Sequence, residues 1–230
     1  MSPPTDGWIR IAPPESVYFD AKGHHVSSMH EEIVRLLPIR KGHFRLESGH
    51  HGDLWLDLEL LCLDPEPIRR FAREVAARLA RHNLEIVCGP LIEGAFVALM
   101  VASELGLPFC YTERLETAAG NRAQRPADAL YPVQYRIPNA LRAKVRGKRV
   151  AVVNDVINAG SAVRATLADL TACEARPIAI AALLVLGEWA SEHARAENLA
   201  LETLATLPNP IWIPSACPFC EKGVPFTAPE

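Results

Sequence analysis

The segment Arg149–Arg164 carries the residues best suited to chemistry in this chain. Val150–Val153 is a β-branched apolar run that predicts a buried strand, and Asn154 and Asp155 follow where that strand would end. Small residues come next, namely Asn158, Ala159, Gly160, Ser161 and Ala162. A small-residue turn that leads into a helix presents unpaired backbone N–H groups to an anion such as phosphate. Because an acid precedes this turn and can hold ribose hydroxyls, the segment predicts a sugar-phosphate site.

Single residues in this segment have alternative interpretations. Ser161 is expected to cap a helix over residues 162–173, and an ordinary capped turn is the structural alternative to a phosphate site. Asp155 is expected to be functional, because a carboxylate at the end of a buried strand needs a partner. Asn154 can bond a ribose hydroxyl but contributes no negative charge.

The same residues resemble the phosphoribosyl-pyrophosphate (PRPP) motif of the type I phosphoribosyltransferases. Asp155 matches the second of that family's two acids, and residues 158–162 match the loop that wraps the 5′-phosphate. Asn154 stands where the family carries its first acid. The resemblance implies PRPP or a nucleoside monophosphate as ligand, with Mg²⁺ bound alongside PRPP.

Within that family the chain looks most like orotate phosphoribosyltransferase, over roughly Lys41–Glu188. Phe44–Gly49 is similar to an early strand that ends in Ser-Gly, and Gly106–Tyr111 to the strand before the mobile catalytic loop. The pyrophosphate loop is matched by Pro90, Leu91, Ile92, Glu93 and Gly94, which follow Gly89. The resemblance implies transfer of ribose 5-phosphate from PRPP to a small nitrogenous base with release of pyrophosphate, by a homodimer.

Several positions that are basic in the family hold other residues in this chain. These positions are Glu47, Glu93, Thr117, Ala119 and Glu188. Arg114 keeps its positive charge, so the resemblance assigns catalysis to Arg114 and Asp155. Each lost charge-assisted contact to a pyrophosphate is worth about 1.5–3 kcal/mol. Other cations that could replace the lost ones are Arg122, Arg125, Arg136, His50 and His51.

Two functions therefore stand side by side. The first is an orotate phosphoribosyltransferase-like enzyme whose base is not specified by the sequence. The alternative is a non-catalytic regulatory protein that binds PRPP or a nucleotide on the same fold. The mobile catalytic loop of the family carries a lysine and a histidine that this chain lacks, and their loss favours the alternative. The intact phosphate loop is compatible with both functions.

A Cys-Pro-Phe-Cys motif near the C-terminus is a second candidate site. Cys217 and Cys220 have the spacing of half a zinc site, and a second pair of ligands would have to come from elsewhere, for example His50 or His51. A structural turn in the tail is the alternative. The other cysteines lie in or beside apolar segments and are expected to be core residues.

The elements that position these residues follow an α/β rhythm. Helices are expected over residues 28–37, 65–79, 95–105, 162–173 and 189–197, and strands over 85–88, 108–112, 149–153, 177–186 and 211–213. A strand pair with its turn at 48–52 precedes them, and residues 113–148 form a long excursion. This pattern predicts a parallel sheet flanked by helices, with ligands at the carboxyl ends of the strands.

The domain prediction divides the chain into an extension and one domain. Residues 1–27 are expected to be an irregular N-terminal extension. Residues 28–230 form a single phosphoribosyltransferase-like domain, with a hood over 28–64, an α/β core over 65–200 and a C-terminal tail over 201–230.

Composition narrows the remaining possibilities. Hydrophobic residues make up 49% of the 230 residues and charged residues 22%, which is ordinary for a globular protein. The net charge of −3 argues against nucleic acid as a partner. No apolar run reaches the ~18 residues of a membrane span, and the N-terminus has no signal-peptide core. The expectation is a cytoplasmic protein that does not bind a membrane.

Overall fold

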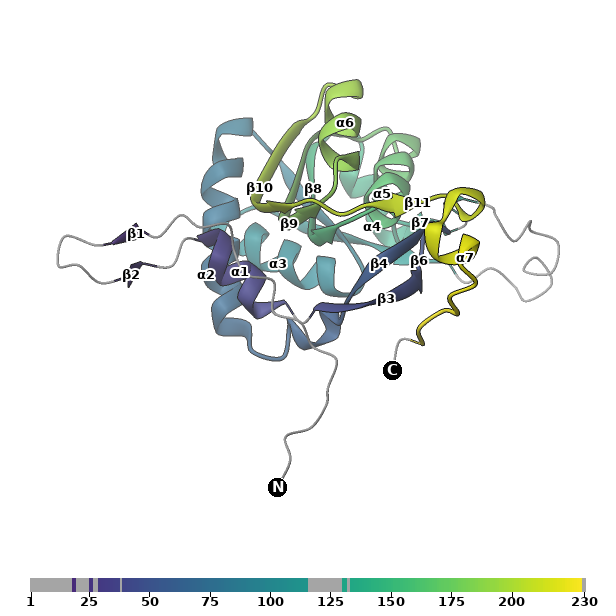
Figure 1. Cartoon of the computed structure of the whole chain (residues 1–230). Helices are drawn as coiled ribbons and strands as arrows, with labels where there is room; N and C mark the ends of the chain where they lie inside the picture. The colour runs from purple at the N-terminus through teal and green to yellow at the C-terminus, as the bar shows by residue number, and fades with distance from the viewer. Residues whose placement is uncertain are drawn as a thin grey trace.

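The computed structural model describes residues 18–19, 25–26, 29–37, 39–115, 130–131 and 133–228. A six-stranded sheet lies at its centre in the order β10-β9-β8-β5-β6-β7 (Figure 1). Its strands are β5 (Ile86–Pro90), β6 (Phe109–Arg114), β7 (Tyr135–Arg136), β8 (Arg149–Ile157), β9 (Arg176–Leu186) and β10 (Ala200–Leu207). All neighbouring strands pair in parallel except β6 and β7. The predicted parallel sheet is confirmed.

Helices cover both faces of this sheet. One face carries α1 (Met29–Leu36), α2 (Pro65–Leu79) and α3 (Glu93–Leu105), and the other α4 (Asn139–Val145), α5 (Ser161–Ala172) and α6 (Trp189–Ala196). Side chains of β8 alternate between the two cores: Ala151 and Val153 join the first, Val150 and Val152 the second. A strand buried on both faces has apolar residues at successive positions, which is why β8 was predictable from the sequence.

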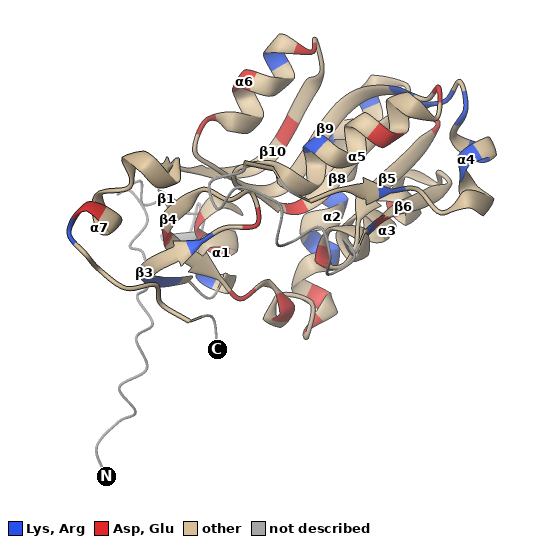
Figure 2. Ribbon diagram, turned by 90° about the vertical axis from the view of Figure 1, so that its right-hand side faces the viewer, with Lys and Arg blue, Asp and Glu red and all other residues tan. Residues whose placement is uncertain are grey.

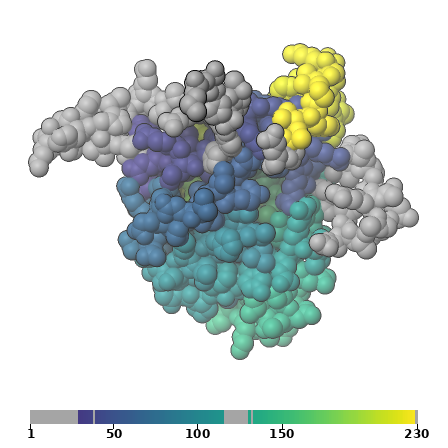
Figure 3. Space-filling view, turned by 90° about the horizontal axis from the view of Figure 1, so that it is seen from below, coloured from purple at the N-terminus to yellow at the C-terminus, as the bar shows by residue number. Residues whose placement is uncertain are grey.

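The N-terminal hood is a second, smaller sheet that the C-terminal tail completes. β3 (Ile39–Arg45) and β4 (His51–Leu56) form an antiparallel hairpin, and β11 (Ile211–Trp212) adds to the free side of β4. The tail then forms the short helix α7 (Pro218–Glu221). In Figure 3 the yellow tail lies against the purple hood, so segments from opposite ends of the sequence share one face.

Three stretches differ from the sequence-based prediction. The long excursion contains β7 and α4, and the extension predicted to be irregular contains an antiparallel pair, β1 (Tyr18–Phe19) with β2 (His25–Val26). The core sheet also continues into the predicted tail, because β10 pairs with β9 through Leu207.

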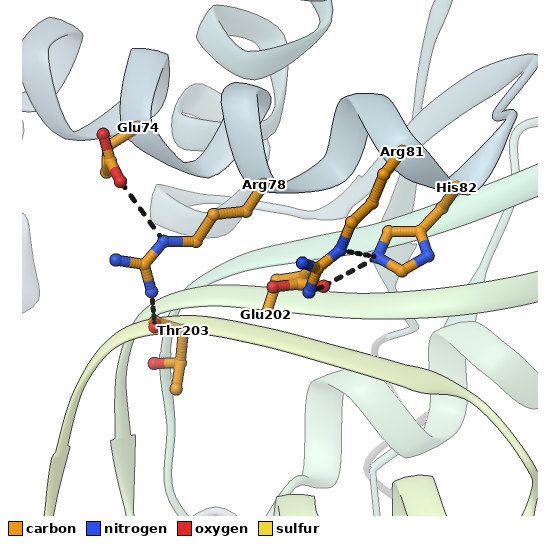
Figure 4. A network of polar contacts seen from close by, with 6 residues as sticks. All are labelled: Glu74, Arg78, Arg81, His82, Glu202 and Thr203. Atoms are coloured by element: carbon orange, nitrogen blue, oxygen red, sulfur yellow. Dashed lines mark hydrogen bonds and ion pairs between the residues drawn. The ribbon is translucent and has the colours of Figure 1, made fainter.

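A polar network explains how β10 can carry a buried acid. Glu202 accepts hydrogen bonds from Arg81 and pairs with His82, each at 2.6 Å, just beyond the end of α2 (Figure 4). Arg78 of α2 donates to the backbone carbonyl of Thr203. These contacts attach the edge strand to the C-terminal end of α2. Because β10 carries polar residues, it lacks the continuous apolar run from which the other strands were predicted.

The basic residues before β8 lie around α4, at the end of the molecule away from β3 and α7 (Figure 2). Arg142 pairs with Asp169 at 3.0 Å, and Lys148 and Arg149 pair with Glu85. The cluster is thus balanced by acids. Within the described ranges, no helix is long and apolar enough to cross a membrane.

Candidate active site

The predicted phosphate loop lies at the carboxyl end of β8, but the strand is longer than expected. It continues past Val153 to Ile157, with Asn154 opposite Ala182 and Val156 opposite Leu184 of β9. The helix α5 then begins at Ser161. Asn154 and Asp155 are therefore strand residues held in a hydrogen-bonded ladder, which fixes them more rigidly than a loop would.

Ser161 is not the N-cap of α5. Gly160 occupies that position with φ of +77°, a left-handed conformation that glycine adopts without steric cost. The Ser161 hydroxyl makes no capping bond, and it is buried with no partner among the described residues. A buried polar atom without a partner costs free energy, so this hydroxyl is free to bond a group that enters from the cavity.

One cavity of about 400 Å³ brings the predicted residues together. It lies at the carboxyl ends of β5 and β8, where a parallel sheet places its ligands. Its described lining includes Arg114, the ribose-phosphate residues Asn154, Asp155, Asn158, Ala159, Gly160, Ser161 and Ala162, and the pyrophosphate-loop residues Pro90, Leu91, Ile92, Glu93 and Gly94.

The hood contributes apolar residues to the lining of this cavity, beside Glu47, Ser48 and Glu59. The apolar residues are Leu46, Leu54, Trp55, Leu56 and Leu58. Sequence reasoning expected these residues to pack within a strand pair, with base stacking as the alternative for Trp55, and did not predict that they line the cavity. The sequence signal for this apolar lining was the alternation of leucines with polar residues, because such alternation gives a two-stranded sheet one apolar face.

Asp155 is the most perturbed carboxylate in the cavity. Its side chain is 3% exposed, and Oδ2 has no hydrogen-bond partner in the described part of the chain. Burial raises the pKa of Asp155 to about 7, the backbone N–H of Val156 opposes this rise, and the negative charge of Glu93 adds to it. A cation or a hydroxyl donor in the cavity would relieve this carboxylate.

Asn154 lines the cavity and also contacts the pyrophosphate loop. Its amide donates to the Val156 carbonyl at 2.8 Å, and its Oδ1 lies against Gly94 so closely that a Cβ there would overlap it. Asn154 thus braces the phosphate strand against the pyrophosphate loop. A cis peptide bond joins Leu91 to Ile92 within that loop.

The charges around the cavity are mostly negative. Glu47, Glu59, Glu93 and Asp155 line it, whereas Arg114 is the one lysine or arginine among the described lining residues. Arg114 Nε lies 3.3 Å from Glu47 Oε1, which also accepts a 3.2 Å hydrogen bond from the Tyr135 hydroxyl.

The described residues among the proposed replacement cations, Arg136, His50 and His51, do not line this cavity. Arg136 borders a separate cavity beside α5, and the His50 ring contacts Ser48 at 3.0 Å. Glu188, the N-cap residue of α6, is absent from the described cavity lining. Thr117, Ala119, Arg122 and Arg125 lie outside the described residues.

Solved structures share this fold. Adenine phosphoribosyltransferase from Trypanosoma brucei, in complex with AMP, pyrophosphate and ribose 5-phosphate, superposes with a TM-score of 0.59 over 77% of this chain and 79% of that one, at 18% identity. Orotate phosphoribosyltransferase from Aeropyrum pernix gives 0.52 over 74% and 88%, at 22% identity. The fold is that of the type I phosphoribosyltransferases.

Comparison with known sequences identifies a narrower family than the fold does. Orotate phosphoribosyltransferase from Pelotomaculum thermopropionicum is 30% identical over 205 residues, covering 86% of this chain and 96% of the relative. The enzyme of the same name from Nitratiruptor is 28% identical over 209 residues, covering 86% and 94%. No protein-family model matches the chain. On the strength of these relatives, the chain belongs to the orotate phosphoribosyltransferase family.

The raised pKa of Asp155 predicts a pH dependence of stability. Between the ordinary value of 3.8 and about 7, the native state holds a proton that the unfolded state has lost. The stabilisation is therefore complete below pH 3.8 and is lost as pH rises through 7, at about 1.4 kcal/mol per pH unit. Denaturant melts from pH 5 to pH 8 should show the wild type losing about 2–3 kcal/mol relative to Asp155→Asn. Parallel curves for the two proteins would contradict the assignment.

Proposed function

We propose that this protein transfers ribose 5-phosphate from PRPP to a nitrogenous base and releases pyrophosphate. The observation that carries the proposal is one cavity lined by the pyrophosphate loop, Asp155 and Ser161, whose Oδ2 and Oγ atoms are buried without a partner among the described residues. Both atoms are satisfied when a ribose 5-phosphate occupies this cavity. Membership of a family of enzymes supports the same reaction.

Each part of PRPP has matching groups in the cavity. The 5′-phosphate is assigned to the turn at 158–162 and the first N–H groups of α5, where the helix dipole favours an anion. Asp155 accepts hydrogen bonds from the ribose hydroxyls, and the pyrophosphate lies along residues 90–94 near Arg114. Holding these groups in place and neutralising the departing pyrophosphate would supply most of the rate enhancement.

The cavity also fits the Mg²⁺ that family members use with PRPP. Hard cations prefer carboxylate oxygens, and the Asp155 carboxylate lies beside the negative charge of Glu93. These two residues would hold the ion. When bound, Mg²⁺ would neutralise part of the negative charge of pyrophosphate. This matters here because the acids of the described lining repel that charge.

The base would pack between the apolar hood residues and the sugar site. Trp55 offers an aromatic face there, and its Nε1 donates to Asp57 at 2.9 Å, which orients the ring. The relatives are named for orotate, a carboxylate base. The carboxylates of the described lining favour an uncharged base over a negatively charged one. Comparing the rate of transfer to orotate with the rates for neutral pyrimidines and purines therefore identifies the acceptor.

A turnover assay tests the proposed reaction. The full chain is incubated with Mg²⁺, PRPP and each base, and both pyrophosphate and the nucleoside monophosphate are quantified. Equal amounts of the two products with at least one base are expected. Saturable PRPP binding without pyrophosphate from any base would instead establish the regulatory alternative, which the pairing of Arg114 with Glu47 favours.

Arg114 provides a sharper test of the pyrophosphate assignment. Replacing it by Gln removes one charge-assisted contact worth about 1.5–3 kcal/mol, so the Kd for PRPP should rise about 10- to 100-fold. Arg176→Gln, at the opposite end of the sheet in β9, should leave the Kd unchanged. Equal effects of both variants would show that Arg114 does not contact the ligand.

Assembly and location are proposals drawn from the family. We propose a cytoplasmic homodimer, and light scattering of the purified chain measures its mass directly. A monomeric mass across the working concentration range would exclude the dimer.

A further inference from the structure

A second cluster of chemically capable side chains lies between the hood and the tail. His43 of β3 and His51 of β4 face Cys217 and Cys220, which lie before and within α7. One ligand atom from each of these residues falls within 4.8 Å of the other three. Figure 1 shows α7 beside the ends of β3 and β4, away from the helices that cover the core sheet.

We propose that His43, His51, Cys217 and Cys220 bind a structural Zn²⁺ ion. With Zn–S near 2.3 Å and Zn–N near 2.0–2.1 Å, a tetrahedral site has edges of about 3.3 Å between nitrogens and about 3.6 Å between sulfur and nitrogen. His43 Nε2 lies 3.3 Å from His51 Nδ1 and 3.4 Å from Cys217 Sγ. Cys220 Sγ lies 3.7 Å from His43 Nε2 and 3.3 Å from His51 Nδ1. These four edges are close to those of a zinc tetrahedron, and the two remaining edges, both of which involve Cys217, are no longer than 4.8 Å.

The orientation of His43 supports a metal at this position. Its Nδ1 donates to the backbone carbonyl of Val224 at 2.9 Å, which leaves the lone pair on Nε2 directed at the two thiols. A backbone carbonyl on the far ring nitrogen is the usual support of a metal-bound histidine. Phe219 and Phe226 stack on the His43 ring with centroids 5.2 and 4.2 Å away and limit access of water.

Burial and ligand number distinguish a structural from a catalytic site. His43, His51 and Cys217 are buried, and Cys220 closes the cluster from the exposed side. Two thiolates and two imidazoles complete a four-coordinate shell, so no position is left for a substrate. Both thiols are free in the structure, as metal binding requires. Burying these polar groups side by side without a metal would be costly.

The proposed ion would tie the tail to the hood. Around the cluster, β11 pairs with β4, and Thr227 exchanges hydrogen bonds with the backbone of His43 at 2.7 and 3.1 Å. The same hairpin supplies Leu54 and Trp55 to the ligand cavity. Zinc would thus stabilise the wall against which the base is proposed to pack, without contacting the reacting groups.

Metal content of the untagged full chain tests the proposal. After expression with added zinc and gel filtration, elemental analysis should find about one zinc per chain, as a complete four-ligand site requires. Cobalt substitution should give the intense visible bands of a tetrahedral ion with thiolate ligands. Absence of tightly bound metal after reconstitution, or a Cys217–Cys220 disulfide in the freshly purified protein, would overturn the proposal.

Variants separate metal binding from folding. Cys220→Ala should lose the zinc, whereas Cys220→His should retain it, because the exposed position accepts another ligand. Cys62→Ser, outside the cluster, is the matched control and should keep a full complement of metal. Circular dichroism shows whether each variant is folded. Full zinc in folded Cys220→Ala would contradict the assignment of this ligand, and PRPP turnover is not needed for either readout.

Discussion

Replacing Asp155 by Asn is expected to reduce kcat/KM for PRPP by about 10²- to 10³-fold, the usual effect of removing one group that stabilises charge in a transition state. The isosteric amide keeps the packing of β8, so the loss would come from charge rather than shape. The carboxylate is the buried group with the clearest unmet need for a partner, because Oδ2 has none among the described residues.

Steady-state kinetics and thermal melts of the same preparations check this prediction. Asp64→Asn is the matched control: Asp64 caps α2 by accepting from the Glu66 N–H, and Asn caps a helix equally well. The control should retain activity and melting temperature. If Asp155→Asn keeps wild-type kcat/KM while folded, Asp155 has no role in the reaction.

Replacing Gly160 by Ala is expected to destabilise the protein by about 2–5 kcal/mol and to abolish PRPP binding. The left-handed backbone costs an alanine about 1–2 kcal/mol, and overpacking adds about 1–3 kcal/mol. The overpacking arises because the new Cβ would overlap the Trp189 ring. Any relaxation must move the turn that holds the 5′-phosphate.

A glycine with the same backbone but open surroundings isolates the steric part. Gly147 has φ of +70°, and no neighbouring side chain or backbone lies within 4 Å of the place where a Cβ would be added. Gly147→Ala should therefore cost only the conformational penalty and leave binding intact. Urea melts and PRPP titrations compare the two variants. Adding Trp189→Ala to Gly160→Ala should restore part of the binding; equal behaviour of the two glycine variants would refute the proposed contact.

The α/β core was predictable because its strands and helices have simple causes. The apolar run of β8 and the Asp64-Pro65 start of α2 each follow from local chemistry, and the structure confirms both. The phosphate turn and the pyrophosphate loop share one cavity because parallel strands present their carboxyl ends at the same edge.

Features that depend on tertiary contacts were not predictable. Gly160 rather than Ser161 caps α5, because the choice depends on a left-handed turn packed against Trp189. His43 was missed as a partner of the cysteines, because it is far from them in sequence and only the pairing of the tail with the hood brings them together. Edge strand β10 was missed because its buried acid, Glu202, is satisfied by Arg81 and His82, which lie just beyond the end of α2.

The most direct test of the central claim is a calorimetric titration of PRPP with Mg²⁺ into the full-length chain. The structure predicts a saturable heat that corresponds to one site per chain and that disappears in Gly160→Ala while persisting in Gly147→Ala. No heat at millimolar PRPP from folded wild-type protein would contradict the assignment of residues 154–162 as a ribose 5-phosphate site.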